Sequence, residues 1–94
     1  MSIKSEIEEF VSSLNFEDEI STNEFKTELN KQYGRPKSCY VPSDYCYNRT
    51  NYGINYDIQP HYFMYVKRGL YQYVGKDYSF SGEIEHKPRN KKVL

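Results

Sequence analysis

The stretch that decides the fold runs from position 61 to position 74 and reads HYFMYV, KRG and LYQYV. Two runs rich in aromatic and β-branched residues, on either side of a short turn that contains glycine, are typical of a β-hairpin. Alternation places Tyr62, Met64 and Val66 on one face of the first strand. It places Phe63 and Tyr65 on the other face. Since both faces carry large apolar groups, helices must cover at least one of them.

The first candidate for that cover is an amphipathic helix at the start of the chain. Its apolar stripe comprises Ile3, Ile7, Phe10, Val11 and Leu14, which recur with helical spacing. Ser2 is suited to cap the first turn, and the acidic residues that follow suit the positive end of the helix dipole.

A second helix is predicted between Ser21 and Gly34. Ser21 and Glu24 have the spacing of a capping box, in which each side chain satisfies a backbone donor of the other. Gly34 and the nearby Pro36 stop the helix, because glycine accepts a left-handed conformation and proline cannot continue the helical hydrogen bonds. The apolar face consists of Phe25, Leu29 and Tyr33. The residues between the two helices, 15–20, read as a connector.

A third, weaker helix is predicted between Ser43, as its cap, and Gly53, as its end. A turn of about 100° per residue separates a polar face from a packable one. The polar face carries Asp44, Tyr47, Asn48 and Asn51, and the packable face carries Tyr45, Cys46, Arg49 and Tyr52. The helix propensity of Tyr, Asn and Thr is poor, so this element depends on tertiary packing.

Three helices followed by a hairpin with a basic turn predict an α+β fold of the winged helix-turn-helix type. The run from Val41 to Asn51, which contains the pattern P-S-D-Y-C-Y-N-R-x-N, and the two hairpin strands resemble a small bacterial and phage domain of unknown function with a winged-helix-like layout. The resemblance implies a fold more than an activity. We expect one domain over residues 1–85 and a basic, flexible tail over residues 86–94.

Composition limits the classes of function. The 94 residues allow one small core. The net charge is zero, but residues 1–34 have a balance of −5 and residues 35–94 one of +5. No apolar run is long enough to span a bilayer and no secretion signal is evident, so the sequence predicts a cytoplasmic protein without membrane contact. The two cysteines and two histidines lack the spacing of a zinc site, so neither a metal nor a cofactor is expected.

On this fold, the favoured function is non-catalytic binding of double-stranded DNA, in a regulatory or targeting role. The third helix would offer a phenol and two amides to the duplex, while basic residues of a loop and of the hairpin turn hold the phosphates. The predicted DNA-binding residues are Lys37, Tyr47, Asn48, Asn51, Lys67 and Arg68. A solvated helix face without a partner explains the same polar residues equally well.

The alternative is a protein-binding module. Ten tyrosines lie between positions 40 and 78, and tyrosine is enriched at interfaces as well as usable in a core. A protein partner such as a nuclease fits this interpretation, including a phage-encoded inhibitor of a host defence nuclease of the anti-CRISPR or anti-restriction type. No glycine-rich phosphate loop or catalytic triad is present, so no enzymatic activity is expected. The oligomeric state is left open, with a dimer as one possibility.

Overall fold

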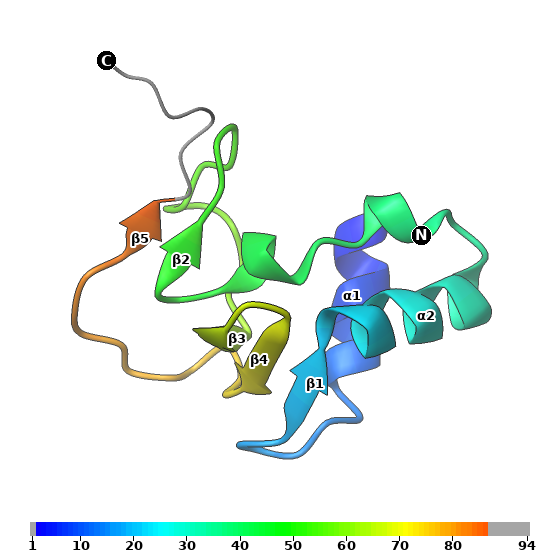
Figure 1. Ribbon diagram of the computed structural model, residues 1–94, viewed down its shortest axis with the longest axis horizontal. Helices are drawn as coiled ribbons and strands as arrows, with labels where there is room; N and C mark the ends of the chain where they lie inside the picture. The colour runs from blue at the N-terminus through cyan, green and yellow to red at the C-terminus, as the bar shows by residue number, and fades with distance from the viewer. Residues whose placement is uncertain (1, 87–94) are drawn as a thin grey trace.

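The computed structural model describes residues 2–86 and places two helices beside a small antiparallel sheet (Figure 1). A second, two-stranded sheet lies on the far side of the hairpin from the helices. The elements in chain order are α1 (Ile3–Val11), β1 (Glu19–Ser21), α2 (Thr22–Tyr33), the 3-10 turns η1 (Lys37–Cys39) and η2 (Pro42–Tyr45), β2 (Arg49–Thr50), β3 (Phe63–Lys67), β4 (Leu70–Tyr73) and β5 (Glu85–His86).

The two predicted long helices are confirmed, with the caps that their sequences indicate. Ser2 caps α1 by accepting a hydrogen bond from the backbone of Ser5. In α2 the capping box is complete, because Ser21 Oγ accepts from Glu24 N at 3.0 Å and Glu24 Oε1 accepts from Ser21 N at 2.9 Å. Gly34 ends α2 with a φ of 83°, a left-handed value that glycine adopts without strain. Neither these helices nor any other in residues 2–86 combines the length and hydrophobicity that crossing a bilayer requires.

The predicted hairpin is also confirmed, but it belongs to a three-stranded sheet. β3 and β4 pair antiparallel, and β1, which the sequence indicated as a connector, pairs antiparallel with β4. The strand order is therefore β1-β4-β3. Where β1 ends and α2 begins, Thr22 N donates to Gly69 O at 3.0 Å. This bond attaches the hairpin turn to the first residue of α2.

The prediction of a third helix is wrong, and with it the winged helix-turn-helix assignment. Residues 42–45 form a single 3-10 turn, and Cys46 is extended, with φ −102° and ψ 148°. Tyr47 N donates to Phe63 O at 2.9 Å, and Tyr62 N donates to Tyr45 O at 2.8 Å. The backbone at 45–47 therefore pairs with the start of the hairpin and cannot form helical bonds with its own neighbours. The broader assignment to the α+β class holds.

The core is built around the ring of Phe63, which is fully buried. Its centroid lies 5.7 Å from that of Phe25 of α2 and 6.2 Å from that of Tyr71 of β4, both edge-on. Phe25 in turn packs edge-on against Phe10 of α1, at 5.8 Å. Edge-to-face aromatic pairs at such distances are favourable beyond the area they bury. One chain of rings thus joins both helices to the sheet.

A buried carboxylate joins α1 to the segment that follows α2. Glu6 is 5% exposed. Its two oxygens accept hydrogen bonds from Arg35 Nε at 2.9 and 3.0 Å, and Tyr40 OH donates to Oε1 at 2.7 Å. Hydrogen bonding to Arg35 lowers the pKa of Glu6 below its ordinary value of 4.5, although burial acts in the opposite direction. The carboxylate is therefore ionised at neutral pH.

The lowered pKa of Glu6 predicts a loss of stability in acid. A group whose pKa is depressed by folding stabilises the fold above its unfolded pKa, and that contribution disappears as the pH falls through the folded pKa. We therefore expect the melting temperature of the wild type to fall more steeply below pH 4.5 than that of Glu6→Gln. The additional fall of the wild type should be several degrees. Thermal unfolding followed by circular dichroism across the acid range measures this. Parallel pH profiles for the two proteins would assign the acid sensitivity to other carboxylates.

The C-terminal part of the described chain returns to the segment that failed to form a helix. β5 pairs in parallel with β2, with Arg49 opposite Glu85 and Thr50 opposite His86. Of the tail predicted over residues 86–94, His86 belongs to this strand, and residues 87–94 lie outside the described part of the chain.

Candidate functional site

The three residues expected to contact DNA from the third helix do not share an exposed face. Tyr47 is 8% exposed, and its hydroxyl donates to Gly75 O at 2.6 Å. Asn48 is bound to the peptide groups of Tyr65: its Nδ2 donates to the carbonyl at 3.1 Å and its Oδ1 accepts from the amide at 2.8 Å. Their polar atoms therefore hold the protein together and are not presented to a duplex.

Asn51, the third of these residues, is also bonded internally. Its Nδ2 donates to Ser43 Oγ at 2.8 Å and to Asp44 Oδ1 at 2.6 Å. The amide thus bridges the hydroxyl and the carboxylate of η2. The expected contacts of Tyr47 with a phosphate and of Asn48 and Asn51 with base edges required a helix, and without that helix the three side chains have separate partners within the protein.

The three basic residues predicted to hold phosphates lie in two places. Lys67 and Arg68 are exposed together at the turn between β3 and β4. Lys37 is exposed in η1, where its carbonyl accepts a hydrogen bond from Lys26 Nζ of α2. The structure therefore keeps the two hairpin cations as a pair, and Lys37 is no part of the site described next.

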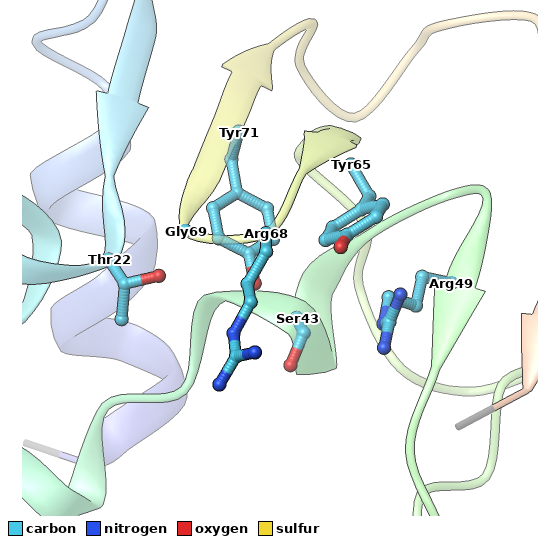
Figure 2. Close-up of a pocket in the computed structure, with 7 residues that line it drawn as sticks. All are labelled: Thr22, Ser43, Arg49, Tyr65, Arg68, Gly69 and Tyr71. Carbon is cyan, nitrogen blue, oxygen red and sulfur yellow. The ribbon is translucent and has the colours of Figure 1, made fainter. Parts of the chain in front are cut away.

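A hollow of about 480 Å³ lies where the β3–β4 turn meets the start of α2 and the segment from η2 to β2 (Figure 2). Figure 2 shows Thr22 on one side and Arg49 with Tyr65 on the other, with Arg68 extending from the turn between them. The lining residues are Thr22, Ser43, Arg49, Tyr65, Arg68, Gly69 and Tyr71. We call this site the arginine hollow.

The position of Arg49 follows from its neighbours. Asn48 fixes the chain against Tyr65 of β3 through the two hydrogen bonds described above. The guanidinium carbon of Arg49 then lies 4.3 Å from the centroid of the Tyr65 ring, a cation–π contact. Such stacking holds the planar guanidinium by one face, and its N–H groups lie within the guanidinium plane.

Arg68 is positioned by the turn rather than by a side-chain contact. Gly69 has a φ of 80°, which allows the chain to reverse directly after Arg68. The carbonyl of Gly69 accepts from Thr22 N, so the turn is held at the first residue of α2. Arg68 is thereby brought beside the hydroxyl-bearing residues of the hollow while its side chain remains exposed to solvent.

Hydroxyl groups complete the lining. Burial raises the pKa of the Tyr71 phenol above its ordinary value of 10.0, while hydrogen bonding with Ser43 and Thr22 acts in the opposite direction. The phenol is therefore protonated at neutral pH and has a proton to donate. Because Ser43 Oγ already accepts from Asn51, its own O–H is directed to another acceptor.

Two arginines line the arginine hollow, and among residues 2–84, whose side chains the structure describes, no carboxylate lines it. The nearest acid along the sequence, Asp44, lines a different hollow, together with residues of α1 and of the 53–59 loop. Two guanidinium groups and several hydroxyls around one space form a site for an oxygen-rich anion.

Sequence reasoning missed most of this site. It identified Arg68, but it placed Arg49 on a packed helix face, gave Ser43 only the role of a helix cap and gave no binding role to Thr22 or Tyr71. These residues lie far apart in the sequence and show no local spacing. The only local signal was the basic hairpin turn.

Cys46 and His61 are both packed within the protein. Cys46 is fully buried, and this burial raises the pKa of its thiol far above the ordinary value of 9.0, which disfavours the nucleophilic thiolate. The ring of His61 stacks on that of Tyr56, with centroids 4.2 Å apart, and its Nε2 lies 3.0 Å from Tyr56 O. Within residues 2–86, no three His, Cys, Asp or Glu side chains gather as a metal ion would require.

Comparison with known proteins identifies a family but no activity. Residues 2–93 match a family described as a domain of unknown function, DUF7225. The uncharacterized protein YnaC of Bacillus subtilis (strain 168) is 37% identical to the chain over 70 residues. This match covers 74% of the chain but 26% of the Bacillus protein, so the chain spans about a quarter of the length of that relative. No solved structure matches the chain.

Proposed function

The chain belongs to the DUF7225 family of domains of unknown function, and we propose that it is a non-catalytic module that binds double-stranded DNA through its phosphates. The observation that carries this proposal is the arginine hollow, in which the exposed Arg68 extends beside Arg49 and several hydroxyl groups. The match to a quarter of a longer Bacillus protein supports a role as a module.

The chemistry of the hollow suits a phosphate contact. Arginine, serine, threonine and tyrosine side chains supply most of the hydrogen bonds that proteins make to the nucleic-acid backbone. Lys67 is a second exposed cation, next to Arg68 at the β3–β4 turn. Backbone contacts position a protein on the duplex but do not read its sequence. Because the amides of Asn48 and Asn51 have partners within the protein, the binding we propose is independent of base sequence.

The charge distribution along the chain supports the same proposal. The acidic residues are concentrated in residues 1–34, which include both helices, and the hairpin turn is basic. A protein of zero net charge can still attract a polyanion through one face when its charges are segregated in this way. DNA would then approach the turn and the hollow.

Protein binding is the second candidate, and one observation favours it. Tyr52 and Ile58, in the loop between β2 and β3, are 63% and 73% exposed. Exposed aromatic and aliphatic groups in one loop are typical of a surface that contacts another protein. A protein partner, such as the nuclease considered above, would contact this loop. Substitutions in the arginine hollow would then leave binding unchanged.

Salt dependence and a single substitution test the DNA proposal. When the logarithm of affinity is plotted against the logarithm of salt concentration, each neutralised phosphate contributes roughly −0.9 to the slope. Contacts by Arg49, Arg68 and Lys67 therefore predict a total slope between about −2 and −3. Arg68→Ala should weaken binding about tenfold, since one charge-assisted contact is lost. Fluorescence anisotropy with a short labelled duplex of random sequence measures both quantities.

Lys31→Ala is the matched control, because it removes an exposed cation from the last turn of α2, the end opposite Thr22. We expect it to bind as the wild type does. Affinity that does not change with salt, or equal weakening in the two variants, would contradict the proposed contact site.

A further inference from the structure

A second hollow, of about 340 Å³, lies between the end of α1, Tyr62 and residues 73–77, and we call it the tyrosine hollow. The ring of Tyr62 packs edge-on against Phe63 in the core, and the residue is 2% exposed. Its hydroxyl has no hydrogen-bond partner among the described residues. A phenol buried in this way is costly unless it forms a hydrogen bond. Only a group that enters the hollow can satisfy it, so Tyr62 marks a place for a ligand.

The charges around the tyrosine hollow are mainly negative. Among the described residues, the charged ones that line it are Glu8, Lys76 and Asp77. Two further acids, Glu17 and Asp18, are exposed and lie beside Tyr73, which also lines the hollow. Glu17 N donates to Tyr73 O at 2.7 Å, and Tyr73 N donates to Asp18 O at 2.8 Å. A positively charged ligand is therefore favoured over an anion.

An ammonium group of the protein itself already lies beside this hollow. Lys76 Nζ is 3.2 Å from Glu8 Oε2, and the two side chains are 56% and 58% exposed. Exposed ion pairs of this kind contribute little to stability. A second ammonium group can therefore compete for Glu8 without a large loss to the fold.

Two other groups can accept hydrogen bonds from such a ligand. Asp77 is exposed and has no ion pair within the described chain. The oxygen of the Tyr62 hydroxyl is also able to accept. Burial, and after it the charge of Glu8, raises the pKa of Tyr62 to about 12, so the phenol is neutral at neutral pH. Together with Glu8, these acceptors equal in number the three donors of an ammonium group.

Apolar groups form another part of the lining. Val11 of α1 and Val74 are 2% and 7% exposed, and both line the hollow. A lysine buries its methylene stem along such a surface while its charged end reaches polar groups. We propose that the tyrosine hollow takes a lysine side chain from a basic segment of a partner protein. This interaction does not rest on DNA binding, because among the described residues the two hollows share no lining residue.

The test compares two short peptides with the same basic flanking residues and one central residue that is either lysine or Nε-acetyllysine. Because the flanking charges are identical, general attraction to the acidic surface is the same for both. Nuclear magnetic resonance of the isotope-labelled protein follows binding through the amide signals of Val74 and Gly75. We expect the lysine peptide to bind about tenfold more tightly, since charged hydrogen bonds are lost on acetylation. Equal affinity of the two peptides would overturn the proposal.

Tyr62→Phe removes only the hydroxyl and should weaken binding of the lysine peptide about tenfold. Since this hydroxyl has no partner in the described chain, the melting temperature should stay the same or rise. Tyr40→Phe is the matched control, because it removes the same atom from a buried tyrosine whose hydroxyl donates to Glu6 at 2.7 Å. It should lower the melting temperature and leave peptide binding unchanged. Wild-type affinity in Tyr62→Phe, or a melting temperature as low as that of Tyr40→Phe, would contradict the proposal.

Two further measurements examine the charge of the ligand and its source. Lys76→Ala removes the competing ammonium from Glu8, so it should strengthen binding of the lysine peptide roughly twofold to fivefold. Unchanged or weaker binding would contradict the proposed contact with Glu8. Butylammonium should displace the peptide only at concentrations far above those of the peptide itself. Displacement at equal concentrations would assign the hollow to a free amine and overturn the partner protein as the source.

Discussion

Phe63→Ala is expected to destabilise the fold by about 4 kcal/mol, the middle of the range for truncating a buried phenylalanine. The ring of Phe63 is fully buried and has edge-on contacts with rings of α2 and of β4. Since the total stability of a small domain is about 5–15 kcal/mol, this loss leaves the variant barely folded. Urea unfolding followed by far-ultraviolet circular dichroism measures the change.

Phe16→Ala is the matched control, because the same atoms are removed from a side chain that is 62% exposed. Its free energy of unfolding should lie within about 0.5 kcal/mol of the wild type. If the two variants lost the same stability, Phe63 would not be the centre of the core described above.

Asn48→Ala is expected to act on both stability and binding. The substitution removes the two hydrogen bonds to Tyr65 and leaves a half-buried peptide without its partners, at a cost of about 2 kcal/mol. Asn48 precedes Arg49, whose guanidinium stacks on the same Tyr65. Loss of these two hydrogen bonds should displace Arg49. Duplex binding should then weaken about tenfold, the loss of affinity expected when one charge-assisted contact is removed.

Chemical unfolding and fluorescence anisotropy measure the two effects, with binding recorded where circular dichroism shows the variant to be folded. Asn23→Ala provides the control, because Asn23 is an exposed residue of α2. It should change neither quantity. Normal affinity in a destabilised Asn48→Ala protein would show that Asn48 serves the fold alone.

The arginine hollow could not have been found in the sequence. Its lining residues extend from Thr22 to Tyr71 and come from three segments. The contact between Gly69 and Thr22 exists only because β1 pairs with β4, and that pairing had no sequence signal beyond a short connector. Arg68 was accessible to prediction because a basic residue before a turn glycine remains exposed in any hairpin.

By itself, the sequence determined the two helices and the hairpin. Their signals are local: the capping box of Ser21 and Glu24, the stop at Gly34 and the aromatic runs before and after Gly69 act between residues close in the chain. Such interactions have the same effect in any surroundings. The neighbouring residues alone therefore specify these elements.

Only the tertiary structure decided the conformation of residues 43–53. Their pattern of polar and packable residues was compatible with a helix, but their helix propensity is poor, so local energies left the choice open. The backbone of Tyr45 and Tyr47 bonds instead to Tyr62 and Phe63. Hydrogen bonds to a strand that the core already holds satisfy the same peptide groups without the cost of helix nucleation. The same pairing places Arg49 beside the hairpin.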